Sequence, residues 1–490
     1  MGNNASTTST EPGVASGVTI DRFDPLTVAT FRYVSASVDY GNAEADPVGV
    51  RFSYALDDAA GNEVVTCHET FTFPRPDTEI TPTRREAFER FVLHLGLAAG
   101  LSYYKLAAPP RVEISDAYAP EGFSIGEIAF HRRLLAKGLG EFSFVNGLDA
   151  ELQPEFSYRS AVRREPVRNL IPHKGPLVPV GGGKDSCVSI EILRSAATYD
   201  ARFSPTLITV NRYPVISDVI RDASLPDIAV VRTLDAKLGV LNSLGALNGH
   251  VPATAIVSLA VICAAVLHGH GAVVMSNERS ASEGNVEYQG IEINHQWSKS
   301  GEAEEAIAAL VRSIAPELAY FSLLRPLSEL SIARRFAATC GRYFDSFSSC
   351  NAAFRLDPAR RTTRWCGHCP KCQFVYLALA TALDREVLEG IWGSELFESS
   401  EEDGFAALLG LRDWKPFECV GEYGECRVAL QMVMENPQWA AHPVLDRLKS
   451  QLHAVSGWST TADRERVFAE STSFVPADFL KILQGAKATP

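Results

Sequence analysis

The sequence has neither a long apolar run nor an excess of basic residues, and each absence removes a class of protein. The longest apolar run, residues 255–267, is shorter than the roughly 20 residues that span a bilayer and predicts a buried core helix. Acidic residues outnumber basic ones by 59 to 46, a net charge of −13, which disfavours a protein that coats nucleic acid. The first residues also lack the basic and apolar segments of a signal peptide. We therefore expect a cytoplasmic protein with no membrane or nucleic-acid partner, whose oligomeric state the sequence does not specify.

The chain divides into five segments that differ in composition and hydrophobic periodicity. Residues 1–18 are small and polar and predict a disordered leader. Residues 19–150 mix strand-like alternation with helical periodicity and predict an N-terminal α+β domain, and the charged, proline-punctuated residues 151–175 predict a linker. In residues 176–345 short apolar strands alternate with helices, which predicts an α/β fold with a doubly wound parallel sheet. Residues 346–490 predict a helical C-terminal region that begins with a cysteine motif.

The stretch "PLVPVGGGKDSCVSIEILRSA" (residues 176–196) joins a strand to a helix through three glycines. Glycines let backbone N–H groups approach phosphate oxygens closely, and a helix N-terminus carries a partial positive charge. The turn therefore predicts a phosphate site made of Gly181, Gly182, Gly183, Lys184, Asp185 and Ser186. The Walker pattern fails because Asp185 follows Lys184, and the dinucleotide fingerprint fails because Ser186 replaces its third glycine. An ordinary glycine-rich strand–helix turn is the alternative interpretation.

The turn resembles the pyrophosphate loop (PP-loop) of ATP pyrophosphatases, Ser-Gly-Gly-x-Asp-Ser, with Gly181 in place of the first serine. The resemblance implies that the loop grips the β,γ-diphosphate of ATP while a substrate group attacks the α-phosphorus, which gives AMP. It also implies that Mg²⁺ bridges the phosphates, and Asp185 is the local carboxylate best placed to help hold it.

The second motif is "WCGHCPKC", in which Cys366, Cys369 and Cys372 supply three thiolates from one turn. A closed tetrahedral zinc site needs a fourth ligand. Cys350 is the nearest cysteine upstream, and His368 inside the motif is the alternative. We expect a structural Zn²⁺, because four cysteines leave no open position for catalysis, and an iron–sulfur cluster is the rival. The pyrophosphatases that make 7-cyano-7-deazaguanine carry a similar arrangement of one cysteine followed by three.

Seven segments spread over most of the chain are similar to the UDP-N-acetylmuramoyl-L-alanyl-L-glutamate epimerases of bacterial peptidoglycan synthesis, the MurL family. These segments are "VPVGGGKDSCVSIEILR", "NGHVPATA", "SNERSAS", "NHQWSK", "SLLRPLSEL", "WCGHCPKC" and "KPFECVGE". The resemblance implies a core sheet of the adenine-nucleotide α-hydrolase type. It also implies that ATP adenylates the terminal L-Glu of UDP-N-acetylmuramoyl-L-alanyl-L-glutamate, that the α-carbon is inverted to D-Glu, and that AMP and diphosphate are released.

Proton transfer at an α-carbon needs polar groups on opposite faces of that carbon. Glu278 and Arg279 follow the strand "AVVM", at the strand end where such folds place ligands, and a solvated loop is the alternative. His295 and Lys299 in "NHQWSKS" both titrate usefully when partly buried and are the leading candidates for the proton-transfer residues. The predicted catalytic residues are therefore Glu278, Arg279, His295 and Lys299.

Two more residues have weaker signals. His250 in "NGHVP" is predicted to contact phosphate, and Cys419 in "FECVG" could act as a thiol base, although a lone cysteine is more often a small buried apolar residue. Two alternative functions stay open. One is a PP-loop pyrophosphatase that adenylates another acid or a tRNA base, and the other is a nucleic-acid-binding protein built on the zinc knuckle.

Overall fold

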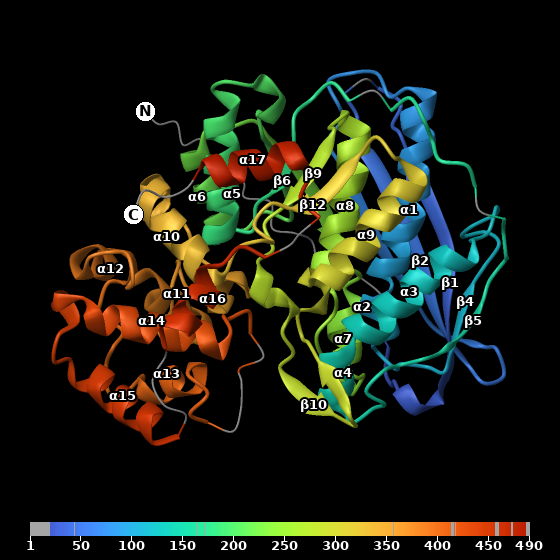
Figure 1. The fold of residues 1–490 in the computed structure, drawn as a ribbon. Coiled ribbons are helices and arrows are strands. Elements are labelled where there is room, and N and C mark those ends of the chain that lie inside the picture. Colours follow the sequence, from blue (N-terminus) through green and yellow to red (C-terminus); the bar gives the residue numbers. More distant parts are fainter. Residues whose placement is uncertain are drawn as a thin grey trace, which may run out of the picture.

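The computed structural model is built around a ten-stranded β-sheet (Figure 1). The structure describes residues 20–43, 45–162, 164–170, 172–355, 357–412, 416, 418–455, 460–471 and 474–486, so the predicted leader at 1–18 lies outside the described residues. The strand order is β12-β9-β6-β7-β8-β3-β2-β1-β4-β5. The bounds are β1 Val28–Asp39, β2 Val48–Asp58, β3 Glu63–Phe73, β4 Arg111–Ile114, β5 Glu155–Ser157, β6 Leu177–Pro179, β7 Thr206–Val210, β8 Asp227–Thr233, β9 Ala272–Met275 and β12 Ala319–Ser322. A separate hairpin pairs β10 (Val286–Tyr288) with β11 (Ile291–Ile293).

Strands β12, β9, β6, β7 and β8 run parallel to one another. β6 comes first along the chain, β7 and β8 lie on one side of it, and β9 and β12 lie on the other. The winding direction therefore reverses beside β6, and ligands of such sheets bind outside the carboxyl ends of the strands at that reversal. The glycine-rich turn that follows β6 and the residues that follow β9 meet at this edge. The predicted α/β class is confirmed.

Helices cover both faces of the parallel strands, which explains why these strands are apolar on both sides. Helices α5 (Lys184–Ala197) and α6 (Pro214–Ala223) lie on one face, and α8 (Ala253–His268) and α9 (Gly301–Ile314) lie on the other. Leu177 of β6 packs with the α8 core, whereas its neighbour Val178 packs with the α5 core. The apolar run at 255–267 is the buried helix α8, as predicted. Among the described helices, none combines the length and apolar content that a membrane span requires.

The N-terminal strands extend the same sheet. β3 pairs antiparallel with β8 through Thr70 and Thr233, so residues 19–150 and the parallel strands share one sheet. Helix α1 (Pro82–Ala99) packs on α8 in a common apolar core, near α2 (Leu101–Tyr104), α3 (Ile125–Gly138) and α4 (Gly140–Asn146). The segment predicted as a linker, 151–175, contributes β5, because the free edge of β4 offers backbone groups that an extended segment satisfies.

The C-terminal region is helical, as predicted, and forms the orange and red part of Figure 1. Helix α10 (Glu329–Thr339), which precedes this region, and α17 (Ala477–Gly485), the last helix of the region, both pack on α5. The C-terminal region therefore touches the helix that follows the glycine-rich turn. The other helices of this region are α11 Pro370–Leu379, α12 Arg385–Trp392, α13 Glu402–Leu408, α14 Tyr423–Glu435, α15 Pro443–Val455 and α16 Thr461–Phe468. Helix α7 (Lys237–Ser243) lies earlier in the chain and precedes α8.

Candidate functional site

The glycine-rich turn joins β6 to α5 at the carboxyl edge of the parallel strands. Helix α5 begins at Lys184 with Gly183 as its N-cap, so the predicted strand–turn–helix is confirmed. Gly182 has a φ of +82°, and a Cβ at this position would lie 3.0 Å from the side chain of Val215. The hydroxyl of Ser186 donates to the carbonyl of Gly183 at 3.0 Å. The N-terminus of α5, where backbone N–H groups are free of helical partners, therefore opens directly after the glycines.

Replacing Gly182 by alanine should lower the free energy of unfolding by about 1–2 kcal/mol, because the left-handed conformation strains any residue with a Cβ. Gly181 is the matched control, since its φ is not positive and a Cβ there meets nothing within 4 Å. Urea unfolding of the two alanine variants measures the difference. Equal losses in both variants would contradict the assigned conformation of the turn.

Three carboxylates, which we call the carboxylate cluster, gather beside this turn: Asp185, Glu278 and Glu329. One oxygen of each lies within 4.8 Å of the others. Asp185 is in the first turn of α5, Glu278 follows β9, and Glu329 opens α10. Glu278 and Glu329 are only 5% and 4% exposed, so the cluster is more than a solvated acidic surface. Glu329 is not among the site residues predicted from the sequence, although its segment "SLLRPLSEL" carries the family resemblance.

Lys184 neutralises part of the carboxylate cluster. Its Nζ lies 2.6 Å from Asp185 Oδ1 and also contacts Glu329. Burial alone would lower the pKa of Lys184, but these two carboxylates raise it, so the side chain stays a cation. The carboxylate of Glu278 accepts no hydrogen bond from any residue that the structure describes. A buried set of oxygen donors with one unpaired carboxylate fits a hard divalent cation such as Mg²⁺.

A second group, the thiol cluster, consists of Cys419, Lys299 and His295. Lys299 Nζ lies 3.0 Å from Cys419 Sγ, and His295 Nε2 lies 3.9 Å from the same sulfur. Burial would lower the pKa of Lys299, but Cys419 and Glu278 raise it, so the amine stays protonated. The influence of Glu278 on Lys299 couples the thiol cluster electrostatically to the carboxylate cluster. The structure therefore brings together His295, Lys299 and Glu278 from the predicted catalytic set and adds the cysteine that the sequence left as a weak candidate.

His250 borders the thiol cluster. Its ring stacks on that of His295 with centroids 5.7 Å apart, and its Nδ1 lies 3.8 Å from Glu141 Oε2. Burial and the nearby ammonium groups of Lys299 and Lys105 lower the pKa of His250 to about 4, while burial raises the pKa of Glu141 to about 7. His250 is therefore a neutral neighbour of His295. Glu141, which comes from helix α4 of the N-terminal region, has no motif that could have singled it out.

Two arginines hold the surrounding segments in place. Arg325 forms a buried ion pair with Glu304 at 2.8 Å and also donates to the backbone carbonyls of Glu278 and Lys299. It therefore fixes one residue of each cluster through the backbone. Arg279, which the sequence placed in the catalytic set, instead donates to the backbone carbonyls of residues 467 and 469 at the end of α16. In this structure its guanidinium supports the C-terminal region.

The four predicted cysteines, Cys350, Cys366, Cys369 and Cys372, meet at one point, with all sulfurs within 4.8 Å of one another. Three of the sulfur–sulfur distances are 3.5, 3.7 and 3.9 Å. A tetrahedral site with metal–sulfur bonds of ~2.3 Å has edges of ~3.8 Å, so the geometry fits a metal, whereas a disulfide is far shorter. The alternative ligand His368 is 79% exposed and pairs with Glu401 at 2.8 Å, outside the group of sulfurs.

The cysteine site also supports the glycine-rich turn. The amide of Ser348, two residues before Cys350, donates to the carbonyl of Gly182 at 2.8 Å. The amide of Cys350 donates to the hydroxyl of Ser348 at 3.1 Å, and that hydroxyl donates to the carbonyl of Arg364. The turn is thus held from one side by the segments that carry the cysteines.

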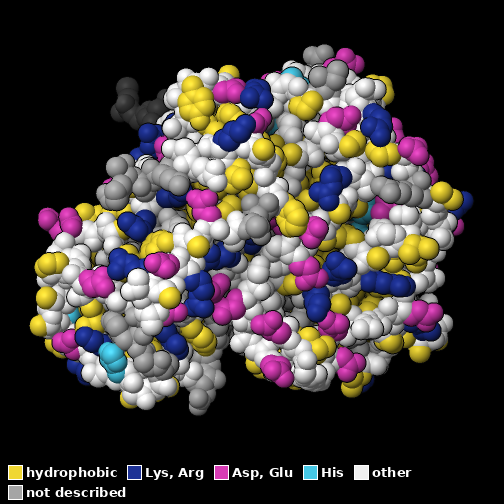
Figure 2. Space-filling model, in the orientation of Figure 1, with side chains coloured by type: hydrophobic (Ala, Val, Ile, Leu, Met, Phe, Trp, Pro, Cys, Tyr) yellow, Lys and Arg dark blue, Asp and Glu magenta, His cyan; other side chains and the backbone are white. Residues whose placement is uncertain are grey.

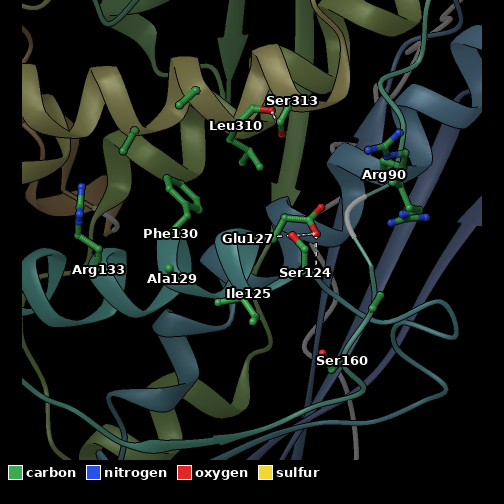
Figure 3. A pocket seen from close by; sticks show the side chains of 15 residues that line it. Arg90, Ser124, Ile125, Glu127, Ala129, Phe130, Arg133, Ser160, Leu310 and Ser313 are labelled. Carbon is green, nitrogen blue, oxygen red and sulfur yellow. Dashed lines mark hydrogen bonds between the residues drawn. The ribbon is translucent and has the colours of Figure 1, made fainter.

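A separate hollow of about 600 Å³ lies between α3 and α9 (Figure 3). Arg90, Arg133 and Arg164 line it, and the capping box of Ser124 and Glu127 at the start of α3 lies in its wall. None of the predicted site residues lines this hollow. The candidate site is therefore defined by the glycine-rich turn and the two clusters.

The fold and the site define a class: an α/β protein in which a glycine-rich turn, buried carboxylates and a thiol–amine–imidazole group share one region. Residues 22–323 match the MurL N-terminal domain, and residues 346–463 match the MurL C-terminal domain. The chain therefore belongs to the MurL family, which confirms the resemblance predicted from its motifs.

Three relatives carry the name UDP-N-acetyl-alpha-D-muramoyl-L-alanyl-L-glutamate epimerase. The one from Salinispora tropica is 40% identical, covering 92% of this chain and 95% of the relative. Those from a Micromonospora species and Xanthomonas oryzae pv. oryzae are 40% and 39% identical, covering 92% and 87% of this chain and 97% and 90% of the relatives. No solved structure matches the chain. The predicted class of enzyme, an isomerase, is confirmed by these relatives.

Proposed function

We propose that the protein inverts the terminal L-Glu of UDP-N-acetylmuramoyl-L-alanyl-L-glutamate to D-Glu in peptidoglycan precursor synthesis, and that ATP adenylates the glutamate carboxylate in the process. The observation that carries the proposal is the electrostatic coupling of the two clusters through Lys299, which donates to Cys419 and whose pKa Glu278 and Asp185 help to raise. A turn suited to phosphate and a cation therefore lies in the same region as groups suited to moving a proton. The names of the relatives support the substrate.

Adenylation has a clear chemical purpose in this reaction. The α-proton of glutamate is hard to remove while a free carboxylate stands beside the α-carbon, because the carbanion would form next to an anion. Joining that carboxylate to AMP removes the charge and provides an acyl group that accepts the electron pair. Inversion then needs a base, an acid on the other face, and water to release AMP. The consumption of ATP by a reaction between epimers follows from this requirement.

Different residues at the glycine-rich turn would bind the diphosphate, contact the other phosphate oxygens and hold the metal ion. The backbone N–H groups around Gly181, Gly182 and Gly183 and the N-terminus of α5 are suited to bind the diphosphate of ATP. Lys184 and Ser186 would contact the phosphates from the first turn of α5. Asp185, Glu278 and Glu329 would hold Mg²⁺, which supplies charge neutralisation at the phosphates when it is bound. Lys184 already offsets part of the negative charge of the carboxylate cluster, so the site stays compatible with an anionic nucleotide.

The four cysteines would hold Zn²⁺ in a structural role. All four positions of the tetrahedron are filled by protein sulfur, so no position is left for a substrate or water. The hydrogen bond from Ser348 to Gly182 gives this site a second purpose, since it fixes the turn that binds phosphate.

Two further parts of the proposal concern location and partners. A cytoplasmic location fits the nucleotide-linked substrate and the need for ATP. A nucleic-acid partner is disfavoured by the net charge of −13, and on the face in Figure 2 the basic side chains are interspersed with acidic ones. We therefore place a small nucleotide-linked peptide, and no nucleic acid, in the site.

The test is to incubate the protein with ATP, Mg²⁺ and the L,L-dipeptide nucleotide and to measure AMP, diphosphate and the configuration of the glutamate after hydrolysis. AMP should appear together with D-Glu, and neither should form when the dipeptide nucleotide is replaced by free L-glutamate or by tRNA. AMP formed with tRNA but not with the dipeptide nucleotide would favour the alternative pyrophosphatase. No D-Glu in the complete mixture would contradict the proposal.

A further inference from the structure

The most informative feature that the proposed function leaves unassigned is the sulfur of Cys419. Two side chains from a distant part of the chain converge on it, with Lys299 Nζ at 3.0 Å and His295 Nε2 at 3.9 Å. We propose that Cys419 is a catalytic residue of the epimerase, the base that removes the α-proton of the adenylated glutamate. This inference rests on the proposed function and adds the identity of one proton-transfer residue.

The surroundings of Cys419 distinguish it from a buried structural cysteine. Cys426 in α14 and Cys187 in α5 are fully buried, whereas Cys419 is partly exposed on a loop. An ammonium group 3.0 Å from a sulfur stabilises the thiolate, which is the reactive and basic form. The imidazole of His295 gives that sulfur a second polar neighbour through which a proton can leave.

Lys299 is poorly suited to be the base itself. Its Nζ already lies 3.0 Å from the sulfur of Cys419, the arrangement of an ammonium group beside a thiolate. A protonated amine cannot accept a proton, but it can hold a thiolate in place and stabilise its charge. Lys299 is therefore a positioning residue in this scheme, and His295 is the polar neighbour that would take the proton from the sulfur.

A second observation points to a ligand site near the sulfur. Glu278 is 95% buried as a residue, and its side chain accepts no hydrogen bond among the described residues, so it points to a ligand of the carboxylate cluster. Glu278 also interacts electrostatically with Lys299, whose Nζ touches Cys419. In space, Lys299 stands between the carboxylate cluster and the sulfur of Cys419. A phosphate bound near the carboxylate cluster would therefore be separated from the proposed base by the side chain of Lys299. The acyl group attached to that phosphate would bring its α-carbon toward the sulfur.

The step balances without an added reagent. The Cys419 thiolate takes the α-proton, so an S–H bond forms as the C–H bond breaks, and the electron pair moves into the acyl group as an enolate. The pair returns to the α-carbon when a proton from solvent is added on the opposite face. The thiol releases its proton through His295 to solvent, so no net proton is consumed. Water then hydrolyses the adenylate to AMP and the D-epimer.

The test is a Cys419→Ser variant assayed in heavy water with ATP and the L,L-dipeptide nucleotide. Inversion and α-deuterium incorporation should fall by at least about 100-fold, the usual contribution of a positioned base. AMP release should stay near the wild-type rate, because water hydrolyses the adenylate without inversion. Cys426→Ala, which removes a buried thiol close by in the chain, should leave both rates unchanged.

Several outcomes would overturn the proposal. Near-normal inversion in Cys419→Ser would contradict it, as would joint loss of AMP and inversion in a folded variant, which would assign Cys419 to adenylation. A dipeptide-nucleotide thioester on Cys419, seen by mass spectrometry, would make the sulfur a nucleophile instead. If the wild-type enzyme forms no AMP from the dipeptide nucleotide, the proposed function fails and this inference fails with it.

A chemical experiment on the wild-type enzyme covers the case in which Cys419→Ser does not fold. Iodoacetamide should alkylate Cys419 first, abolish inversion and spare AMP release, and bound dipeptide nucleotide should protect it. Lys299→Gln should slow the alkylation and Lys299→Arg should restore it, which a purely structural lysine would not do. Full inversion by enzyme that is completely alkylated at Cys419 would overturn the proposal.

Discussion

An Asp185→Asn variant should lose AMP formation and deuterium exchange together, each by about a thousandfold, because a metal clamp at phosphate supplies several kcal/mol and each 1.36 kcal/mol is tenfold. Asparagine keeps the shape of the side chain but removes one of the three charges of the carboxylate cluster. The acyl-adenylate then does not form, and the α-proton keeps its low acidity. The measurement pairs AMP analysis with mass spectrometry of the glutamate recovered from heavy water.

The matched control is Asp218→Asn, which removes a carboxylate from an exposed pair with Arg221 on α6. It should leave both rates unchanged and so show that the effect belongs to the site. Wild-type enzyme without ATP, or with an ATP analogue whose α–β bridge cannot be cleaved, should also give no exchange. Exchange at the full rate without ATP would refute the adenylation mechanism and leave the glycine-rich turn without its proposed role.

Local signals were enough to locate the turn and the cysteine site. Three glycines between a short apolar strand and a helical segment indicate the turn, because glycine adopts left-handed conformations and allows close backbone approach where other residues do not. Cys350 was identified from its proximity in sequence to the C-x2-C-x2-C motif, and folding places its sulfur 3.9 Å from that of Cys369. His368 sits inside the motif, but its ring turns outward to Glu401.

The composition of the two clusters could not be read from the sequence, because their members are far apart along the chain. Glu329 is 145 residues from Lys184, and Cys419 is 120 residues from Lys299. A glutamate at the start of a helix and a single cysteine in a loop each have an ordinary structural explanation. Arg279 shows that a position in the sequence does not fix the direction of a side chain. Its place after β9 predicts that it lies at the site, but its guanidinium donates to a backbone carbonyl at the end of α16.

The same reason explains what was missed in the fold. The apolar patterns of the strands are local, so the parallel strands and the helix α8 were predicted correctly. The pairing of β3 with β8 joins residues more than 150 positions apart, and no local pattern encodes it. The sequence pattern therefore predicts a separate domain at residues 19–150, whereas the sheet is continuous through the pairing of β3 with β8. The strand β5 inside the predicted linker likewise depends on the free edge of β4.

Cys366→Ser should release one tightly held zinc ion and leave much of the protein unfolded. Structural zinc sites contribute about 10 kcal/mol or more to folding, which is comparable to the whole stability of a typical domain. The loss should reach the proposed nucleotide site as well, because the segment of Cys350 holds the carbonyl of Gly182 through Ser348. Elemental analysis, circular dichroism and ATP binding on the same preparation measure the three effects.

His368→Ala is the control, because it tests whether any substitution within the cysteine motif destabilises the protein. The side chain of His368 is 79% exposed and paired with Glu401, so its removal should leave the zinc content, the fold and ATP binding unchanged. Cys350→Ser should instead behave like Cys366→Ser, because its sulfur is one of the four. Zinc retained by Cys350→Ser but lost by His368→Ala would show that the fourth ligand is wrong. Iron in the wild-type protein, together with a visible absorption band, would show that the four cysteines hold an iron–sulfur cluster and not zinc.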